Sequence, residues 1–99
     1  MIARIWHGRT SLEHYEIYTE FLKKKAVPDY QGTPGFIKLM FLRSIINGEG
    51  DFTVITVWEN LEVIKNFAGD DIAKAKYYEE DQEFLLEFEE TVRHFEVFG

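Results

Sequence analysis

Apolar residues recur along this chain with two different periods, and the changes of period divide it into strands and helices. Three stretches rich in apolar and β-favouring residues predict strands over 2–8, 36–45 and 51–59. The last two are joined by 47–50, NGEG, whose Asn-Gly pair is the usual signal of a tight hairpin. The closing stretch 91–98, TVRHFEVF, predicts a fourth strand.

Helical spacing begins directly after the first predicted strand. Thr10 and Glu13 form a capping-box pair, and apolar side chains follow at helical spacing as far as Leu22. Lysines at 23–25 suit the C-terminal end of this helix, where they complement its dipole. Both prolines and two glycines fall within 27–35, so this segment is predicted to be a loop.

A second helix is predicted after Asn60, which can cap it. Ile64 and Phe67 belong to its apolar stripe, Gly69 interrupts it, and the helix is expected to restart near residue 70 and to run through residue 75. A third helical piece is predicted within 77–90, with Phe84 turned inward.

The resulting order is β-α-β-β-α-(α)-β, which is that of a ferredoxin-like α+β fold with a four-stranded antiparallel sheet. Residues 1–99 show no repeat or linker and are expected to form one domain.

The predicted strands are apolar on both faces. An antiparallel sheet with one face in water should alternate apolar and polar residues. Strand 51–59 instead places apolar side chains on each face: Phe52, Val54 and Trp58 on one, Ile55 and Val57 on the other. The helices can cover only one face, so we expect a second copy of the sheet on the other, in a homodimer with two-fold symmetry.

The composition excludes several classes of binding partner and site. The 99 residues include no cysteine, which excludes disulfides and thiolate zinc sites and fits a cytoplasmic protein. The net charge of −7 argues against nucleic acid as a partner. No apolar run is long enough for a membrane span, and the N-terminus is expected to be a folded strand and not a signal peptide. Aromatic residues form 16% of the chain, which suggests a large core, an aromatic-lined cavity or a buried interface.

Histidines are the first candidates for chemistry. The last strand of this fold lies beside the first, so His7 and His94 are expected to be cross-strand neighbours. Such a pair can act as a base, a ligand or two coupled titrating groups. The alternative is that both only cap the sheet end by hydrogen bonds to the backbone. His14 is expected to be solvated.

Other polar residues give weaker signals. Tyr77 can donate a hydrogen bond to a substrate oxygen or can simply pack between core and surface. Seven carboxylates lie between Glu79 and Glu90, and a solvated helix face explains them better than a metal site. Trp58 ends an apolar strand, where core or interface packing is the ordinary role. Metal-binding and nucleotide-binding spacings are absent, and we expect no metal and no cofactor.

Several stretches together resemble the antibiotic biosynthesis monooxygenase family, and the likeness covers nearly the whole chain. They are MIARIWHG at 1–8, TVWEN at 56–60, IKNFAGDDIAKAKYY at 64–78 and HFEVF at 94–98. The resemblance implies a dimeric α+β barrel, in which the sheets of two ferredoxin-like subunits face each other, and a pocket between sheet and helices. It also implies oxidation of polycyclic phenols by O₂ without metal or flavin, after the enzyme assists substrate deprotonation.

Another branch of that family binds and degrades heme. It carries an Asn late in the first strand and a Trp and a His on the second helix. The matching positions of this chain hold His7, Phe67 and Tyr77, so the usual heme ligand is replaced by tyrosine, which can also ligate heme iron.

The function expected from the sequence is therefore a cofactor-independent monooxygenase that acts on a small aromatic or polyketide-like molecule. His7 would be the base, Tyr77 a second polar contact and His94 the residue that orients His7. Phe67, Ile64, Trp58 and Phe84 would bind the substrate. The alternatives are a dimeric ligand-binding or stress protein without turnover, and a heme binder that uses His7, His94 or Tyr77. In this reading Ala3, Ile5 and His7 face the helices, and Trp6 faces the dimer partner.

Overall fold

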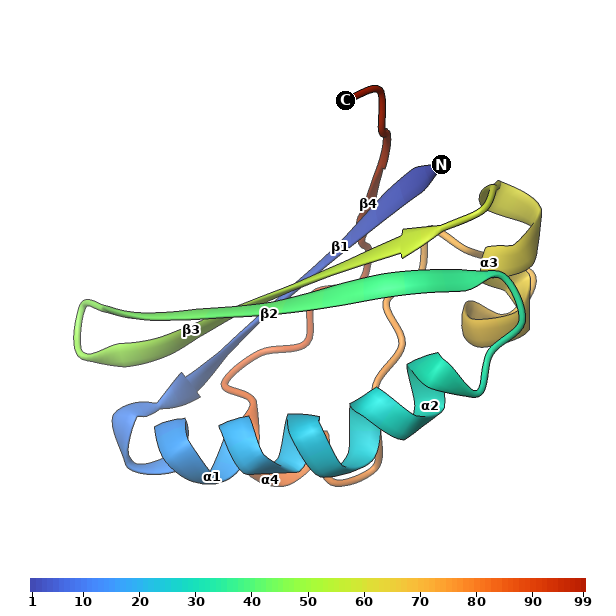
Figure 1. The fold of residues 1–99 in the computed structure, drawn as a ribbon. Helices are drawn as coiled ribbons and strands as arrows, with labels where there is room; N and C mark the ends of the chain where they lie inside the picture. Colours follow the sequence, from blue (N-terminus) through green and yellow to red (C-terminus); the bar gives the residue numbers. More distant parts are fainter.

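A computed structural model describes residues 1–99 and contains a single four-stranded antiparallel sheet (Figure 1). The strand order is β2-β3-β1-β4, which confirms the predicted ferredoxin-like fold. The strands are β1 Ile2–Ser11, β2 Phe36–Ile46, β3 Glu49–Trp58 and β4 Arg93–Glu96. Asn47 and Gly48 turn between β2 and β3 with φ of 52° and 74°, the left-handed conformation that a two-residue hairpin requires.

The helices lie on one side of the sheet (Figure 1). The first helical stretch is longer than predicted and has four parts: η1 Leu12–His14, α1 Tyr15–Phe21, the π-helical η2 Leu22–Ala26 and α2 Val27–Gln31. The predicted loop at 27–35 therefore starts too early. Pro28 lies in the first turn of α2, where a helix tolerates the missing N–H, and the π-helical turn before it shifts the hydrogen-bond pattern.

The second helix, α3 Leu61–Ala68, begins as predicted, with the Asn60 side chain accepting a hydrogen bond from the Val63 N–H. The expected restart over 70–75 does not occur. None of the helices has the length and apolar run needed to cross a bilayer.

The predicted third helix is reduced to one turn, α4 Asp81–Phe84. Glu79, Glu83 and Glu87 recur every four residues, and their like charges disfavour a longer helix. The chain after α4 runs extended instead. The Leu86 N–H donates to the Arg9 carbonyl, and 90–92 pairs with 73–75 through two further backbone bonds.

The core lies between the sheet and the helices and is strongly aromatic. Its buried members are Trp6, Phe52, Val54 and Trp58 from the strands, Tyr18, Leu22, Ala26 and Tyr30 from the first helical stretch, and Ile64, Phe67, Ala75, Leu85 and Val92 from the rest. The expected facing of β1 is reversed. Trp6 points into this core, and His7 lies on the opposite face.

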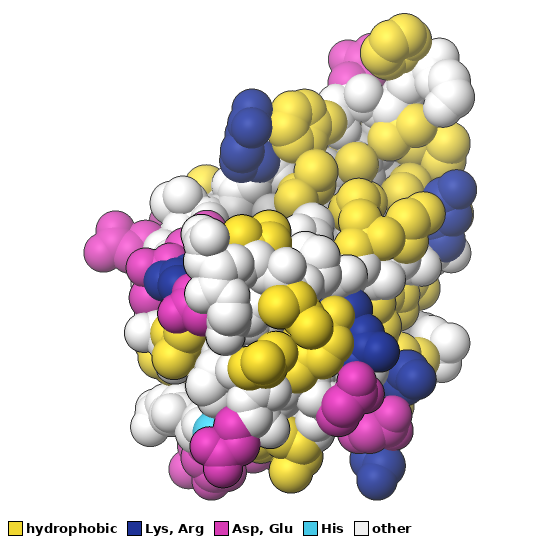
Figure 2. Space-filling view, turned by 90° about the vertical axis from the view of Figure 1, so that its left-hand side faces the viewer, with side chains coloured by type: hydrophobic (Ala, Val, Ile, Leu, Met, Phe, Trp, Pro, Cys, Tyr) yellow, Lys and Arg dark blue, Asp and Glu magenta, His cyan; other side chains and the backbone are white.

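The open face, as we call the sheet surface away from the helices, is also apolar in part. Met40, Leu42 and Phe95 are 52%, 43% and 40% exposed there, beside the half-buried Ile5 and Ile55. Both faces thus carry apolar side chains, as predicted. In a view from the hairpin end, hydrophobic side chains form a broken band next to groups of acidic and basic ones (Figure 2).

Candidate functional site

An inner pocket remains between the sheet and the helices, with a cavity volume of about 20 Å³, enough for one water-sized molecule. It is lined by Trp6 and Val54 of the sheet, Tyr18, Leu22, Ala26 and Tyr30 of the first helical stretch, Phe67 of α3, Lys76 and Tyr78 of the segment between α3 and α4, and Asp81 at the start of α4. Leu22 and Ala26 belong to the π-helical turn, an irregularity that is frequent at functional sites.

Trp6, which lines this pocket, carries an unpaired donor. Its side chain is 9% exposed, and its indole Nε1–H is buried without a hydrogen-bond partner. Buried indole N–H groups are normally paired, because an unsatisfied donor costs about 1–3 kcal/mol. This unpaired N–H, on a residue that lines the pocket, is therefore a candidate donor to a ligand.

Asp81 places a carboxylate in the same pocket. It is 1% exposed and accepts hydrogen bonds from the Tyr18 hydroxyl at 2.9 Å and from the Tyr78 N–H at 2.7 Å. Burial raises the pKa of Asp81, although both hydrogen bonds act in the opposite direction. Burial and the neighbouring carboxylate also raise the pKa of Tyr18, so its hydroxyl stays a donor. Asp81 is thus a proton acceptor with increased basicity.

A second acid, on α2, binds two of the residues that line the pocket. Asp29 Oδ2 accepts from Lys76 Nζ at 2.9 Å and from the Tyr78 hydroxyl at 2.6 Å. Burial alone would raise the pKa of Asp29, but these two donors hold it below its ordinary value. The Lys76 ammonium lies 4.1 Å from the centre of the Phe67 ring. Residues 76–78 are thereby fixed over the pocket.

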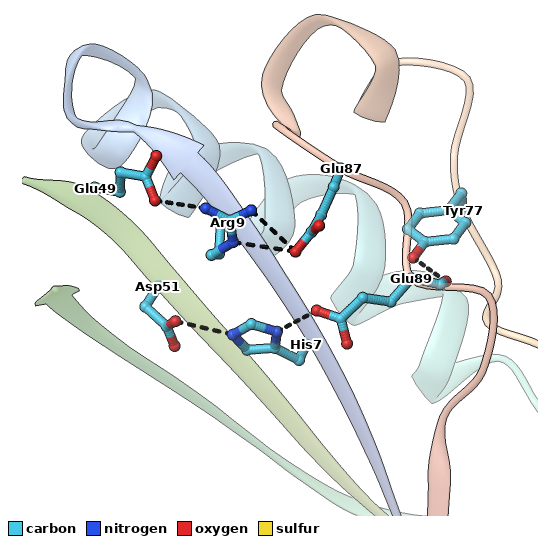
Figure 3. Close-up of polar contacts among 7 residues, drawn as sticks. All are labelled: His7, Arg9, Glu49, Asp51, Tyr77, Glu87 and Glu89. Carbon is cyan, nitrogen blue, oxygen red and sulfur yellow. Dashed lines mark hydrogen bonds and ion pairs between the residues drawn. The ribbon is translucent and has the colours of Figure 1, made fainter. Parts of the chain in front are cut away.

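His7 lies outside the inner pocket, on the open face. Its Nε2 is 2.9 Å from Asp51 Oδ2 on β3, and its Nδ1 contacts Glu89 Oε2 on the extended segment after α4 (Figure 3). Partial burial lowers the pKa of His7, but the hydrogen bonds and charges of the two carboxylates outweigh it and raise the pKa above 6.5. Both ring nitrogens are occupied as donors, so His7 has no free lone pair in this arrangement.

Arg9 repeats this pattern two residues further along β1. Its guanidinium contacts Glu49 on β3 at 2.5 Å and Glu87 on the far side at 3.0 Å (Figure 3). A row of cations on β1 is thus flanked by carboxylates on both sides.

Tyr77 connects the open face with the core. Its hydroxyl donates to the Glu89 carbonyl at 2.5 Å (Figure 3). Its ring meets the Trp6 ring edge-on with centroids 6.0 Å apart. Burial, together with the negative charge of Glu89, raises the pKa of Tyr77 to about 12. Tyr77 also lines an outer cavity of about 410 Å³ between 71–77 and 88–91.

The expected pairing of His7 with His94 is wrong. In the β1–β4 register His94 lies opposite Arg4, whereas β4 ends opposite Ile5 and does not reach His7. His94 Nε2 is 3.1 Å from Arg4 Nη1, and burial, aided by the Arg4 charge, lowers the pKa of His94. A neutral His94 accepts from Arg4, which also donates to two backbone carbonyls. His94 therefore cannot orient His7.

The four residues expected to bind substrate differ in position. Phe67 lines the inner pocket and stacks on Tyr30 at 4.6 Å. Trp58 and Ile64 are fully buried core residues that line none of the cavities. Phe84 packs on Tyr18 beside the pocket, with ring centroids 5.5 Å apart.

Sequence reasoning missed the polar residues of the inner pocket. Asp81 was counted with the solvated carboxylates, and Trp6 was assigned to the opposite face. Gly8 is a signal for the direction of the Trp6 side chain. A Cβ at Gly8 would come within 2.5 Å of the indole ring, so Gly8 lies on the same face of β1 as Trp6 and leaves space for the ring.

Comparison with known proteins supports the fold. No family model matches the chain, and no curated protein matches it in sequence. Among solved structures it is similar to a mutant of MhuD, described as having two manganese protoporphyrin IX bound per active site. The TM-score is 0.61 with 18% sequence identity over 98% of this chain and 94% of that one, so the likeness establishes a shared α+β fold.

Proposed function

We propose that this protein binds a small planar aromatic molecule in the inner pocket and oxidises it with O₂. The observation that carries the proposal is a pocket that holds a buried carboxylate, Asp81, and is lined by Trp6, whose Nε1–H is buried and unpaired. Aromatic walls suit a planar ligand, and a few convergent polar groups would fix its orientation. The ligand needs more room than the pocket of about 20 Å³ gives, so residues 76–78 must move when it enters.

Asp81 is the best-placed group to start the reaction. An acidic O–H or C–H proton of the substrate would pass to its carboxylate, whose raised pKa favours the transfer. The substrate anion would then reduce O₂, so that one oxygen atom enters the product and the other leaves as water. Trp6 Nε1–H would donate to the substrate oxygen. His7, the base predicted from the sequence, has less support, because both of its nitrogens are engaged on the open face.

Binding and oxygen uptake with anthrone-type phenols test this proposal. Trp6→Phe keeps a smaller aromatic ring at this position but removes the donor, and losing one hydrogen bond of about 0.5–1.5 kcal/mol should weaken binding roughly 2–10-fold. Asp81→Asn should abolish oxygen uptake while retaining binding. Glu83→Gln, an exposed change in α4, serves as the control. Unchanged binding in Trp6→Phe and unchanged uptake in Asp81→Asn would refute the proposal.

A ligand-binding protein without turnover is the main alternative. It predicts the same loss of affinity in Trp6→Phe but no oxygen uptake above the rate without protein. The two functions are thus separated by one measurement on the unmodified protein.

Heme binding is favoured by the porphyrin-bound structural neighbour but not by the residues of this chain. His7 is held by two carboxylates, His94 faces Arg4, and the Tyr77 hydroxyl donates to a backbone carbonyl. No candidate presents a free ligand to iron, so these residues do not fit heme. Titration of heme into the protein should give no Soret shift at one equivalent per subunit.

A homodimer through the open face is part of the proposal. Met40 and Leu42 form an exposed apolar area that pairs naturally with a second copy of the same surface. Met40→Glu should then convert the dimer to a monomer in sedimentation velocity runs. Ile17→Glu, a comparable change at a 55% exposed site on α1, should leave it dimeric. A wild-type monomer at micromolar concentration would contradict this.

A further inference from the structure

A continuous line of contacts leads from the open face of the sheet to the inner pocket, and Figure 3 shows its first part, from His7 through Glu89 to Tyr77. His7 holds the side chain of Glu89, and the carbonyl of the same Glu89 accepts the Tyr77 hydroxyl. The Tyr77 ring in turn packs edge-on against Trp6, which lines the inner pocket. One residue, Glu89, therefore couples a titrating side chain on one face to an aromatic wall on the other.

The contacts of His7 depend on its charge. An imidazolium has two N–H donors and can bond Asp51 and Glu89 together, whereas a neutral ring has only one donor. Loss of the proton turns the other nitrogen into a lone pair that faces a carboxylate, which is repulsive. One of the two contacts must then open.

Of the two carboxylates bound to His7, Glu89 is the one that can move away. Asp51 belongs to β3, which is paired with β2 on one side and β1 on the other. Glu89 lies on an extended segment attached by isolated backbone bonds, such as that from the Ala75 N–H to the Glu90 carbonyl. Segments with few backbone bonds open first.

We propose that the proton on His7 acts as a latch behind the inner pocket: it holds Glu89, and through it Tyr77, against Trp6, and its loss releases Tyr77 and loosens Trp6, which lines that pocket. The latch concerns regulation of the site in the proposed function, and its biological meaning rests on that function. Its movement is a property of the protein without ligand.

The other charged groups around His7 have partners of their own, so His7 is the group whose protonation changes. Arg9 on its own strand neutralises Glu49 of β3 and Glu87 of the extended segment. On β4, Arg93 lies opposite Ile5 and stacks over Phe95. Within the subunit, Asp51 and Glu89 remain to face the imidazole, and they outweigh partial burial and raise its pKa, so release is expected above pH 6.5.

Acrylamide quenching of tryptophan fluorescence between pH 5 and 9 tests the latch. Trp58 is fully buried, so a change in quenching reports chiefly on Trp6. We expect quenching of the wild-type protein to increase as pH passes the pKa of His7, determined in parallel from its imidazole NMR signal. His7→Gln and Glu89→Gln should be quenched at the higher level throughout, with the pH transition lost. Glu87→Gln, which removes a carboxylate bound to Arg9, should keep the transition.

Urea unfolding curves at each pH ensure that quenching is compared among folded proteins. A His7 signal that titrates while quenching stays flat would overturn the latch, as would a transition that survives in Glu89→Gln. The proposed function can be refuted independently of the latch. A protein that shows the quenching transition but does not bind aromatic ligands has the latch and lacks the proposed function. Ligand binding without a quenching transition retains the function and removes the latch.

Discussion

Removal of the Asp81 carboxylate should destabilise the protein strongly, because two buried donors depend on it. Asp81→Ala leaves the Tyr18 hydroxyl and the Tyr78 N–H without their acceptor. Each unsatisfied buried donor costs about 1–3 kcal/mol. The mutation also removes the cost of burying a charge, which offsets part of this loss. We therefore expect the free energy of unfolding to fall by about 2–4 kcal/mol, an estimate built on those per-donor values.

Urea unfolding followed by circular dichroism measures this loss. Asp81→Asn retains one acceptor oxygen and should lose about half as much, whereas the exposed Glu83→Ala should stay within roughly 0.5 kcal/mol of wild type. For a domain of this size a loss of 2 kcal/mol corresponds to a Tm decrease of about 8–16 °C. An Asp81→Ala protein as stable as Glu83→Ala would refute the reasoning.

The pH dependence of the same variants gives a second check. The folded pKa of Asp81 is raised above its ordinary 3.8, so the folded state retains this proton longer than the unfolded chain. Its contribution to stability therefore decreases as pH rises from about 3.8 to the raised value. Asp81→Asn should lack this component, which is measured as the difference between the two unfolding curves.

Three further changes test other parts of the structure. His7 has a raised pKa, so its stabilising effect is complete below pH 6.5 and is lost as pH rises through the folded value; urea midpoints of His7→Gln should be flatter over this window. Gly35→Ala places a Cβ 2.4 Å from Val63 at a φ of +91°, and should lower the free energy of unfolding by at least about 1–3 kcal/mol in the same assay. Asn60→Ala removes the cap of α3 and should cost about 1 kcal/mol, with Asn60→Ser close to wild type in thermal melts.

The strands, the hairpin and the start of α3 could be predicted from local signals. The Asn47–Gly48 turn, the Asn60 cap and the apolar strands are properties of short windows, and all appear in the structure. The prediction for the segment after α4 is wrong because contacts with residues distant in the sequence determine its structure. The extended segment after α4 exchanges backbone bonds with β1 and with 73–75, and these contacts replace the helix that its own residues predict.

The positions of His7 and Trp6 show how a site can be misplaced although its strand is predicted correctly. Alternation puts them on opposite faces but does not say which face meets the helices. Hydrophobicity gives a misleading answer, because the core face of β1 also carries Arg4, and the open face carries Ile5.

Close packing resolves this ambiguity. A Cβ at Gly8 would lie 2.5 Å from the Trp6 ring, and one at Gly50 would lie 2.7 Å from Tyr15 of α1. A glycine is needed where large side chains approach the backbone, so both glycines mark the face that meets the helices. That face includes Trp6 and excludes His7. The inner pocket on the helix side therefore contains the buried Asp81 and not the histidine.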